Sequence, residues 1–281
     1  MKRLAALVLS AMLALALAVP AWAEEAEETL MVRPLGCEAE EDFDGDAVVE
    51  KAVLTTDVNE YGDGSFTFSV GDQSFTVEGC ASLEDQVWAL STGDREYIYG
   101  TLFLVSEWGP SDDPLTYCFY YVGGELMDVG AIPAMAEYLE VKEGGIITAW
   151  VTIDLLGTWS RPADYTLASG HDWESEDDTA WYRMVELPRD LYPMGRIAKV
   201  KQALPLLPDR DADGEYTAWI QPDEPVVFTV TDGRCWVHAS SMDGERAGWV
   251  RLRKVDWPLE VLINGEWTPE NDVFSGLMYA G

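Results

Sequence analysis

Apolar and polar residues alternate along much of the chain, a pattern typical of β-strands that bury one face. The clearest case is residues 65–70, in which apolar side chains recur at every second position. Gly71 and Asp72 separate this segment from a second alternating segment, residues 73–77, so we expect a hairpin. The other strands expected in this part of the chain span residues 47–55, 96–105, 117–122, 125–129, 145–153 and 165–167.

Helical periodicity is weak along the whole chain. The best helix candidate is a short one over residues 134–139, directly after Pro133. Gly123 and Gly124 are expected to turn another hairpin. The fold is therefore expected to be all-β. Residues 41–190 would form an antiparallel region, built either as partial propeller-like repeats or as a sandwich.

Two prolines, Pro188 and Pro193, indicate a domain boundary near residues 187–194. After this boundary, short apolar runs alternate with turn residues at a spacing typical of a small barrel, which we expect over residues 195–256. Its clearest strands span residues 225–231, 235–239 and 248–252. Residues 257–281 are expected to form a C-terminal extension with a hairpin that turns at Asn264 and Gly265.

The N-terminus has the three-part pattern of a secretory signal peptide. Lys2 and Arg3 precede an apolar run over residues 4–19, and small residues up to Ala23 provide a cleavage site. The run is short for a bilayer-spanning helix, which needs about 20 residues. We expect a signal peptide over residues 1–23, an acidic leader over residues 24–40, and an extracellular protein with no membrane insertion after cleavage.

The charge of the chain limits its partners. The formal net charge is −33, and removal of Lys2 and Arg3 with the signal peptide would make it −35. Such a surface should repel nucleic acid and anionic lipid and should attract cations, including Ca²⁺, and basic partners. The hydrophobic fraction of 48% is that of a folded protein and argues against general disorder.

The four cysteines leave two interpretations open. Cys37, Cys80, Cys118 and Cys235 allow three disulfide pairings in an exported chain, or they are buried as free thiols. No CxxC spacing supports a zinc site.

No catalytic motif is present in the sequence. The G-x-S-x-G elbow and the H-E-x-x-H helix are both missing, and the only histidines are His171 and His238. We therefore expect a protein that is not an enzyme.

An acidic segment over residues 42–50 is the candidate metal site. Carboxylates occupy its first, third, fifth and ninth positions, which are Asp42, Asp44, Asp46 and Glu50. This spacing lets one loop turn several oxygens toward one centre, as Ca²⁺ requires. An EF-hand is disfavoured because Ala47 and Val53 replace its glycine and glutamate. The alternative is a solvated acidic turn without metal.

The acidic segment resembles the calcium loop of FG-GAP/VCBS-type β-propeller repeats, in which D-x-D-G-D leads into a strand. Residues 62–67, Gly-Asp-Gly-Ser-Phe-Thr, also resemble a turn of those repeats. The sequence departs from the family pattern at Ala47, where glycine is usual, and at Glu50, where aspartate is usual. The resemblance covers residues 41–167, with one well-formed loop and one or two degenerate copies.

The C-terminal region resembles a bacterial SH3-like (SH3b) domain. Residues 234–238, Arg-Cys-Trp-Val-His, and residues 248–252, Gly-Trp-Val-Arg-Leu, flank a turn at Asp243 and Gly244. Residues 203–207 stand where the family has its opening motif, but this sequence lacks the Asn, Arg and Ser of that motif. The resemblance implies peptide binding, often to cell-wall peptides, through a groove that contains Tyr216, Trp219, Trp236 and Trp249. Alternatively, Trp236 and Trp249 form the barrel core, and we expect this for at least one of them.

Aromatic residues also gather in the middle of the chain. They are Trp108, Trp150, Trp159, Trp173, Trp181 and Tyr182. Exposed rings of this kind could form a platform for sugars, whereas buried ones would be core residues or cross-strand pairs, the more common role.

Together these features predict a secreted, non-enzymatic binding protein of the bacterial cell surface. Its partner would be a cell-wall peptide or a surface protein, and Ca²⁺ is a candidate cofactor that the fold does not require. Two alternatives stay open: an accessory cell-envelope hydrolase, and a structural exported protein without a ligand.

Overall fold

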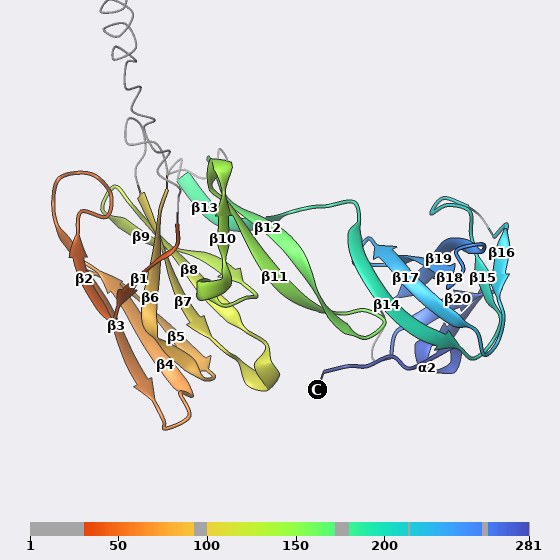
Figure 1. Cartoon of the computed structure of the whole chain (residues 1–281). Helices are drawn as coiled ribbons and strands as arrows, with labels where there is room; N and C mark the ends of the chain where they lie inside the picture. The colour runs from red at the N-terminus through yellow and green to blue at the C-terminus, as the bar shows by residue number, and fades with distance from the viewer. Residues whose placement is uncertain (1–30, 93–99, 172–179, 213, 255–257, 281) are drawn as a thin grey trace, which may run out of the picture. The chain divides into compact units, whose positions relative to one another are not determined.

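The structure is a computed structural model that describes residues 31–92, 100–171, 180–212, 214–254 and 258–280. These residues are all-β, as Figure 1 shows. The expected signal peptide and the first part of the acidic leader lie outside the described residues, as do residues 96–99 of one expected strand.

The first two sheets are antiparallel and share one core. The first contains β2 (Glu38–Glu41), β3 (Glu50–Val58), β4 (Gly64–Val70) and β5 (Gln73–Cys80) in that order. The second contains β1 (Arg33–Gly36), β6 (Leu83–Thr92), β7 (Gly100–Glu107), β8 (Leu115–Val122) and β9 (Glu125–Ile132). Phe68 of the first sheet packs against Phe103 and Phe119 of the second, with ring centroids 5.0 and 5.4 Å away. Aromatic burial between the two inner faces therefore holds the sheets together.

The third sheet is another antiparallel meander. It contains β10 (Glu140–Lys142), β11 (Ile146–Asp154), β12 (Thr158–His171) and β13 (Ala180–Leu187). Residues 38–187 thus hold three meanders of four consecutive strands, with β1 added to the second. Three such meanders are fewer than the blades of a closed propeller, which has at least four.

The C-terminal sheet has seven strands in the order β21-β20-β19-β18-β17-β14-β22. Their bounds are Tyr192–Val200 for β14, Pro225–Thr231 for β17, Trp236–Ser241 for β18, Ala247–Arg253 for β19, Glu260–Ile263 for β20, Glu266–Pro269 for β21 and Phe274–Ser275 for β22. A separate pair, β15 (Leu204–Leu206) and β16 (Ala218–Ile220), completes this part. Its core also includes Leu155, Leu156 and Trp159, which come from β12 and the turn before it.

Several predicted hairpins are confirmed. The chain turns at Gly71-Asp72 between β4 and β5, at Gly123-Gly124 between β8 and β9, and at Asn264-Gly265 between β20 and β21. Gly123 and Gly124 have φ of 58° and 77°, a left-handed conformation that glycine adopts without a Cβ clash.

Three expectations need correction. Within the expected acidic leader, residues 33–36 form β1 and residues 38–40 begin β2, and these strands pair with β6 and β3. The expected helix over residues 134–139 is only a 3₁₀ turn, η2 (Ala136–Tyr138). The C-terminal extension is part of the barrel, because β20, β21 and β22 extend its sheet.

Candidate functional site

The acidic loop, residues 42–50, connects β2 to β3 and is closed by its own carboxylates. Asp42 accepts hydrogen bonds from the backbone N–H of Gly45 at 2.7 Å and of Ala47 at 3.0 Å. Ala47 has φ of 68°, in the left-handed region that favours glycine. Glycine would adopt this conformation without the steric cost that alanine has there.

The acidic loop is fixed to the second sheet at three points. The Phe43 side chain is 1% exposed, and its ring lies 4.9 Å from that of Phe103. Thr101 donates its hydroxyl to the Phe43 carbonyl at 2.7 Å. Asp44 Oδ2 accepts a 2.6 Å hydrogen bond from the N–H of Gly124 in the β8–β9 turn. The loop is therefore ordered by the sheets beneath it.

The structure brings together three of the four expected metal ligands. One carboxylate oxygen each of Asp42, Asp44 and Glu50 lies within 4.8 Å of the others, whereas Asp46 is exposed and outside this group. Burial raises the pKa of Glu50, and the neighbouring carboxylates add to the shift. A cation would relieve this repulsion, but Ca²⁺ takes six to eight oxygens, so water or backbone carbonyls would have to supply the rest.

Trp236 and Trp249 lie on the outer face of the C-terminal sheet. Both are half-buried and neither belongs to the barrel core, whereas their neighbours Val237 and Val250 do. The expectation that at least one of the two tryptophans is a core residue is therefore wrong. The β18–β19 register pairs Trp236 with Arg251 and pairs His238 with Trp249. We call these four residues the barrel face.

Two arginine side chains lie near the aromatic rings of the barrel face. The Arg251 guanidinium lies 5.6 Å from the Trp236 ring, and Arg210 lies 5.4 Å from the Trp249 ring. Arg210 also forms an ion pair with Asp190 at 2.9 Å, whereas Arg251 has no carboxylate partner among the described residues. This face combines aromatic rings with a guanidinium, that of Arg251, for which the described residues provide no carboxylate, in a chain that is strongly acidic.

The other two expected ligand-binding residues form a pair of their own. Tyr216 and Trp219 are half-buried, and their rings meet edge to face at 5.5 Å. The described ring contacts do not join this pair to Trp236 or Trp249. Sequence reasoning missed His238 and Arg251, although the alternation within β18 and β19 places them on the same face as the tryptophans.

The aromatic residues in the middle of the chain do not form one platform. Trp159 is buried in the barrel core, and Tyr182 packs on Tyr120 at 5.0 Å. Trp173 lies outside the described residues. Trp108 and Trp150 line one cavity, and Trp181 is not among its described lining residues.

Comparisons of this chain with protein-family models, curated proteins and solved structures found no match. The SH3-like and propeller-like resemblances therefore rest on the motifs that suggested them. Within the described part of the chain, no helix combines the length and apolar character needed to cross a membrane.

All four cysteines lie in the described residues, and all four are free thiols. A hydrogen bond with Asp85 raises the pKa of Cys37, and burial raises the pKa of Cys80 to about 11. Burial also raises the pKa of Cys118 and Cys235. Because the reactive form of cysteine is the thiolate, these shifts disfavour a cysteine nucleophile at neutral pH.

His238 contacts Thr229 and Trp249. Its Nδ1 lies 2.8 Å from the Thr229 hydroxyl, and its ring meets that of Trp249 at 5.2 Å. Burial lowers the pKa of His238, because it disfavours the charged form of the ring. The side chain of the other histidine, His171, lies outside the described part of the structure.

Proposed function

We propose that this chain is an exported, non-enzymatic binding protein that contacts a peptide of the bacterial cell surface through its barrel face. The observation that carries the proposal is the position of Trp236 and Trp249, which lie on the outer side of the sheet and not in its core. Large rings that lie partly exposed on the outer face of a sheet are typical of recognition surfaces.

The chemistry of the barrel face favours a peptide with carboxylates. Arg251 is exposed and lacks a carboxylate partner among the described residues, so its guanidinium is available to a ligand carboxylate. The adjacent rings of Trp236 and Trp249 would cover the apolar part of the same ligand. A cell-wall peptide or an acidic segment of a surface protein fits this description.

The proposal is tested by co-sedimentation of the mature protein with purified peptidoglycan. We expect the protein to sediment, and we expect Arg251→Gln and Trp249→Ala each to weaken binding by about tenfold or more. Arg251 is exposed, so its substitution tests binding without disturbing the core. Trp181→Ala, an exposed tryptophan on another sheet, is the matched control and should leave sedimentation unchanged.

The two alternatives have distinct outcomes in this assay. Release of soluble fragments that disappears on substitution of a single Cys, His or acidic residue would support an envelope hydrolase. Absence of sedimentation, together with no thermal shift with wall fragments, would support a structural protein without a ligand.

We also propose Ca²⁺ binding at the acidic loop, on the observation that Asp42, Asp44 and Glu50 converge. The melting temperature is expected to be higher in Ca²⁺ than in chelator, because a ligand that binds only the folded state stabilises it by about 2.7 kcal/mol at 100 times its Kd. Asp42→Asn should abolish this difference, whereas Asp46→Asn should retain it because Asp46 lies outside the cluster. Equal melting temperatures in Ca²⁺ and chelator would exclude the site.

A further inference from the structure

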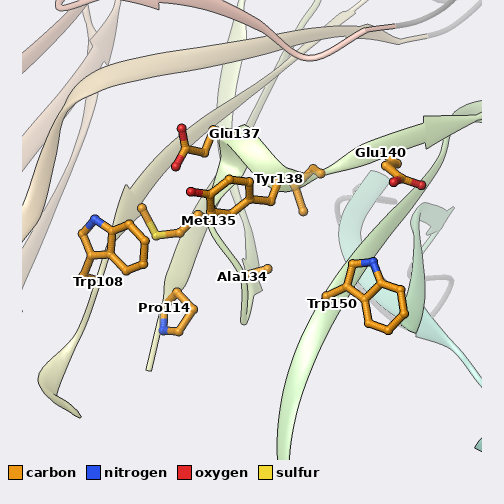
Figure 2. Close-up of a pocket in the computed structure, with 9 residues that line it drawn as sticks. Trp108, Pro114, Ala134, Met135, Glu137, Tyr138, Glu140 and Trp150 are labelled. Carbon is orange, nitrogen blue, oxygen red and sulfur yellow. The ribbon is translucent and has the colours of Figure 1, made fainter. Parts of the chain in front are cut away.

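An open cavity of about 510 Å³ is lined by exposed aromatic rings and carboxylates. We call it the aromatic cavity. Trp108, Tyr138 and Trp150 line it and are 39%, 59% and 58% exposed, and Glu137 and Glu140 supply the acidic groups. Figure 2 shows Tyr138 between the two tryptophans. The volume lies within the range of cavities that bind small ligands, about 300–1,000 Å³.

The aromatic cavity is built on ordered backbone. Its floor includes Met135, which is 1% exposed and directly precedes η2. Two fully buried hydroxyls hold this turn: Ser106 accepts from the N–H of Ala136 at 3.0 Å, and Thr116 donates to the carbonyl of Ala134 at 2.5 Å. Buried polar groups satisfied in this way favour one backbone conformation, so the turn that carries Glu137 and Tyr138 is ordered before any ligand arrives.

The backbone at both tryptophans, Trp108 and Trp150, is also ordered. Trp108 follows β7, and its backbone N–H donates to the Ser82 carbonyl at 3.2 Å. Trp150 lies in β11 between Ala149 and Val151, which are buried on the opposite face. Neither exposed indole is needed to fill a core, and both are presented to the same cavity.

The charged side chains that line the aromatic cavity are all acidic. None of the described residues that line it is basic. Burial raises the pKa of Glu84, and its proximity to the Glu137 carboxylate adds to the shift. The nearest lysine along the chain, Lys142, is held by Asp164 in a 3.0 Å ion pair and does not line the cavity. Carboxylates without a cation next to aromatic faces form a site for a positively charged group.

We propose that the aromatic cavity binds a lysine or arginine side chain of a basic peptide. The cation would lie against one lining carboxylate, Glu137 or Glu140, and the Tyr138 ring between them would contact its aliphatic stem. A neutral sugar would use the rings but would gain little from the carboxylates that line the cavity. The site is separate from the barrel face and independent of the function proposed for it.

Calorimetric titration of the mature protein with a blocked Gly-Arg-Gly peptide tests this proposal. The same peptide with citrulline in place of arginine keeps the shape of the side chain and removes its charge. We expect the arginine peptide to bind and the citrulline peptide to bind at least about tenfold more weakly. Trp150→Ala and Glu137→Gln should each lower the affinity for the arginine peptide by about three- to tenfold, the value of one cation–π or charge contact.

Matched controls separate the cavity from the general negative charge of the protein. Trp181→Ala and Glu266→Gln change an exposed tryptophan and an exposed carboxylate elsewhere and should leave binding unchanged. Arg251→Gln should also have no effect, which distinguishes this site from the barrel face. Equal affinity for the two peptides, no binding, preferential binding of a neutral chitooligosaccharide, or equal losses in the control variants would each overturn the proposal.

Discussion

Replacement of Phe43 by alanine is expected to lower the free energy of unfolding by about 3–5 kcal/mol, the usual cost of removing a buried phenylalanine ring. Phe43 lies between two aspartates of the acidic loop, yet it is 1% exposed and packs on Phe103. The substitution leaves a cavity under the loop and removes the apolar anchor that joins the loop to the second sheet. Urea unfolding followed by circular dichroism measures the loss.

Val49→Ala is the matched control for this prediction, because Val49 lies in the same loop but is 64% exposed. It should change the free energy of unfolding by no more than about 0.5 kcal/mol. If Phe43→Ala cost as little as Val49→Ala, the loop would not be anchored by its ring, and the description of the site as preordered by the sheets would fail.

Asp164→Asn is expected to destabilise the protein by about 2–3 kcal/mol at neutral pH, because it leaves charged and polar partners without their anion. The Asp164 side chain is 17% exposed. It accepts from the Thr148 hydroxyl at 2.6 Å and from Lys142 at 3.0 Å, and it also pairs with Arg189. These contacts join β10, β11 and β12 to the segment after β13.

The low pKa of Asp164 predicts that its contribution to the free energy of unfolding depends on pH. The hydrogen bond from Thr148 and the ion pair with Arg189 hold the pKa of Asp164 well below its ordinary value of 3.8. A carboxylate with a depressed pKa stabilises the folded state above the ordinary pKa, and this stabilisation is lost as the pH falls below it. The difference between the parent protein and Asp164→Asn should therefore be full at pH 7 and should shrink below about pH 4.

Urea unfolding at a series of pH values measures this difference. Asp57→Asn, which changes an exposed aspartate of β3, is the control and should change the free energy of unfolding by at most about 0.5 kcal/mol at any of these values. A difference between Asp164→Asn and the parent that stayed constant down to pH 2 would show that the charge of Asp164 contributes nothing to stability.

The sequence alone determined the local elements of this fold. Period-two alternation placed β4, β5 and β17, and the glycine turns placed the β4–β5 and β8–β9 hairpins. It also placed three carboxylates, Asp42, Asp44 and Glu50, in one loop. These features depend on neighbours within a few residues, so a local pattern contains the information that specifies them.

Strands that depend on distant partners were not predicted. Glu38–Glu41 reads as part of a solvated leader because three of its residues are acidic, yet it pairs with β3, and Lys51 forms an ion pair with Glu38. Pro193 indicated a domain boundary and a break in structure, but it lies within β14 at a register shift, where the strand ladder is irregular. In both cases the partner strand, and not the local composition, determines the structure.

Only the tertiary structure decided which face of each strand is buried. Alternation places Trp236 and Val237 on opposite faces, but it does not say which face is inside. Leu155, Leu156 and Trp159 arrive from a hairpin more than 75 residues earlier and help to fill the barrel core, and the tryptophans of β18 and β19 remain outside. The aromatic cavity arises in the same way, because Trp108 follows β7 of the second sheet and Trp150 lies in β11 of the third, so they line one cavity only when both sheets have folded.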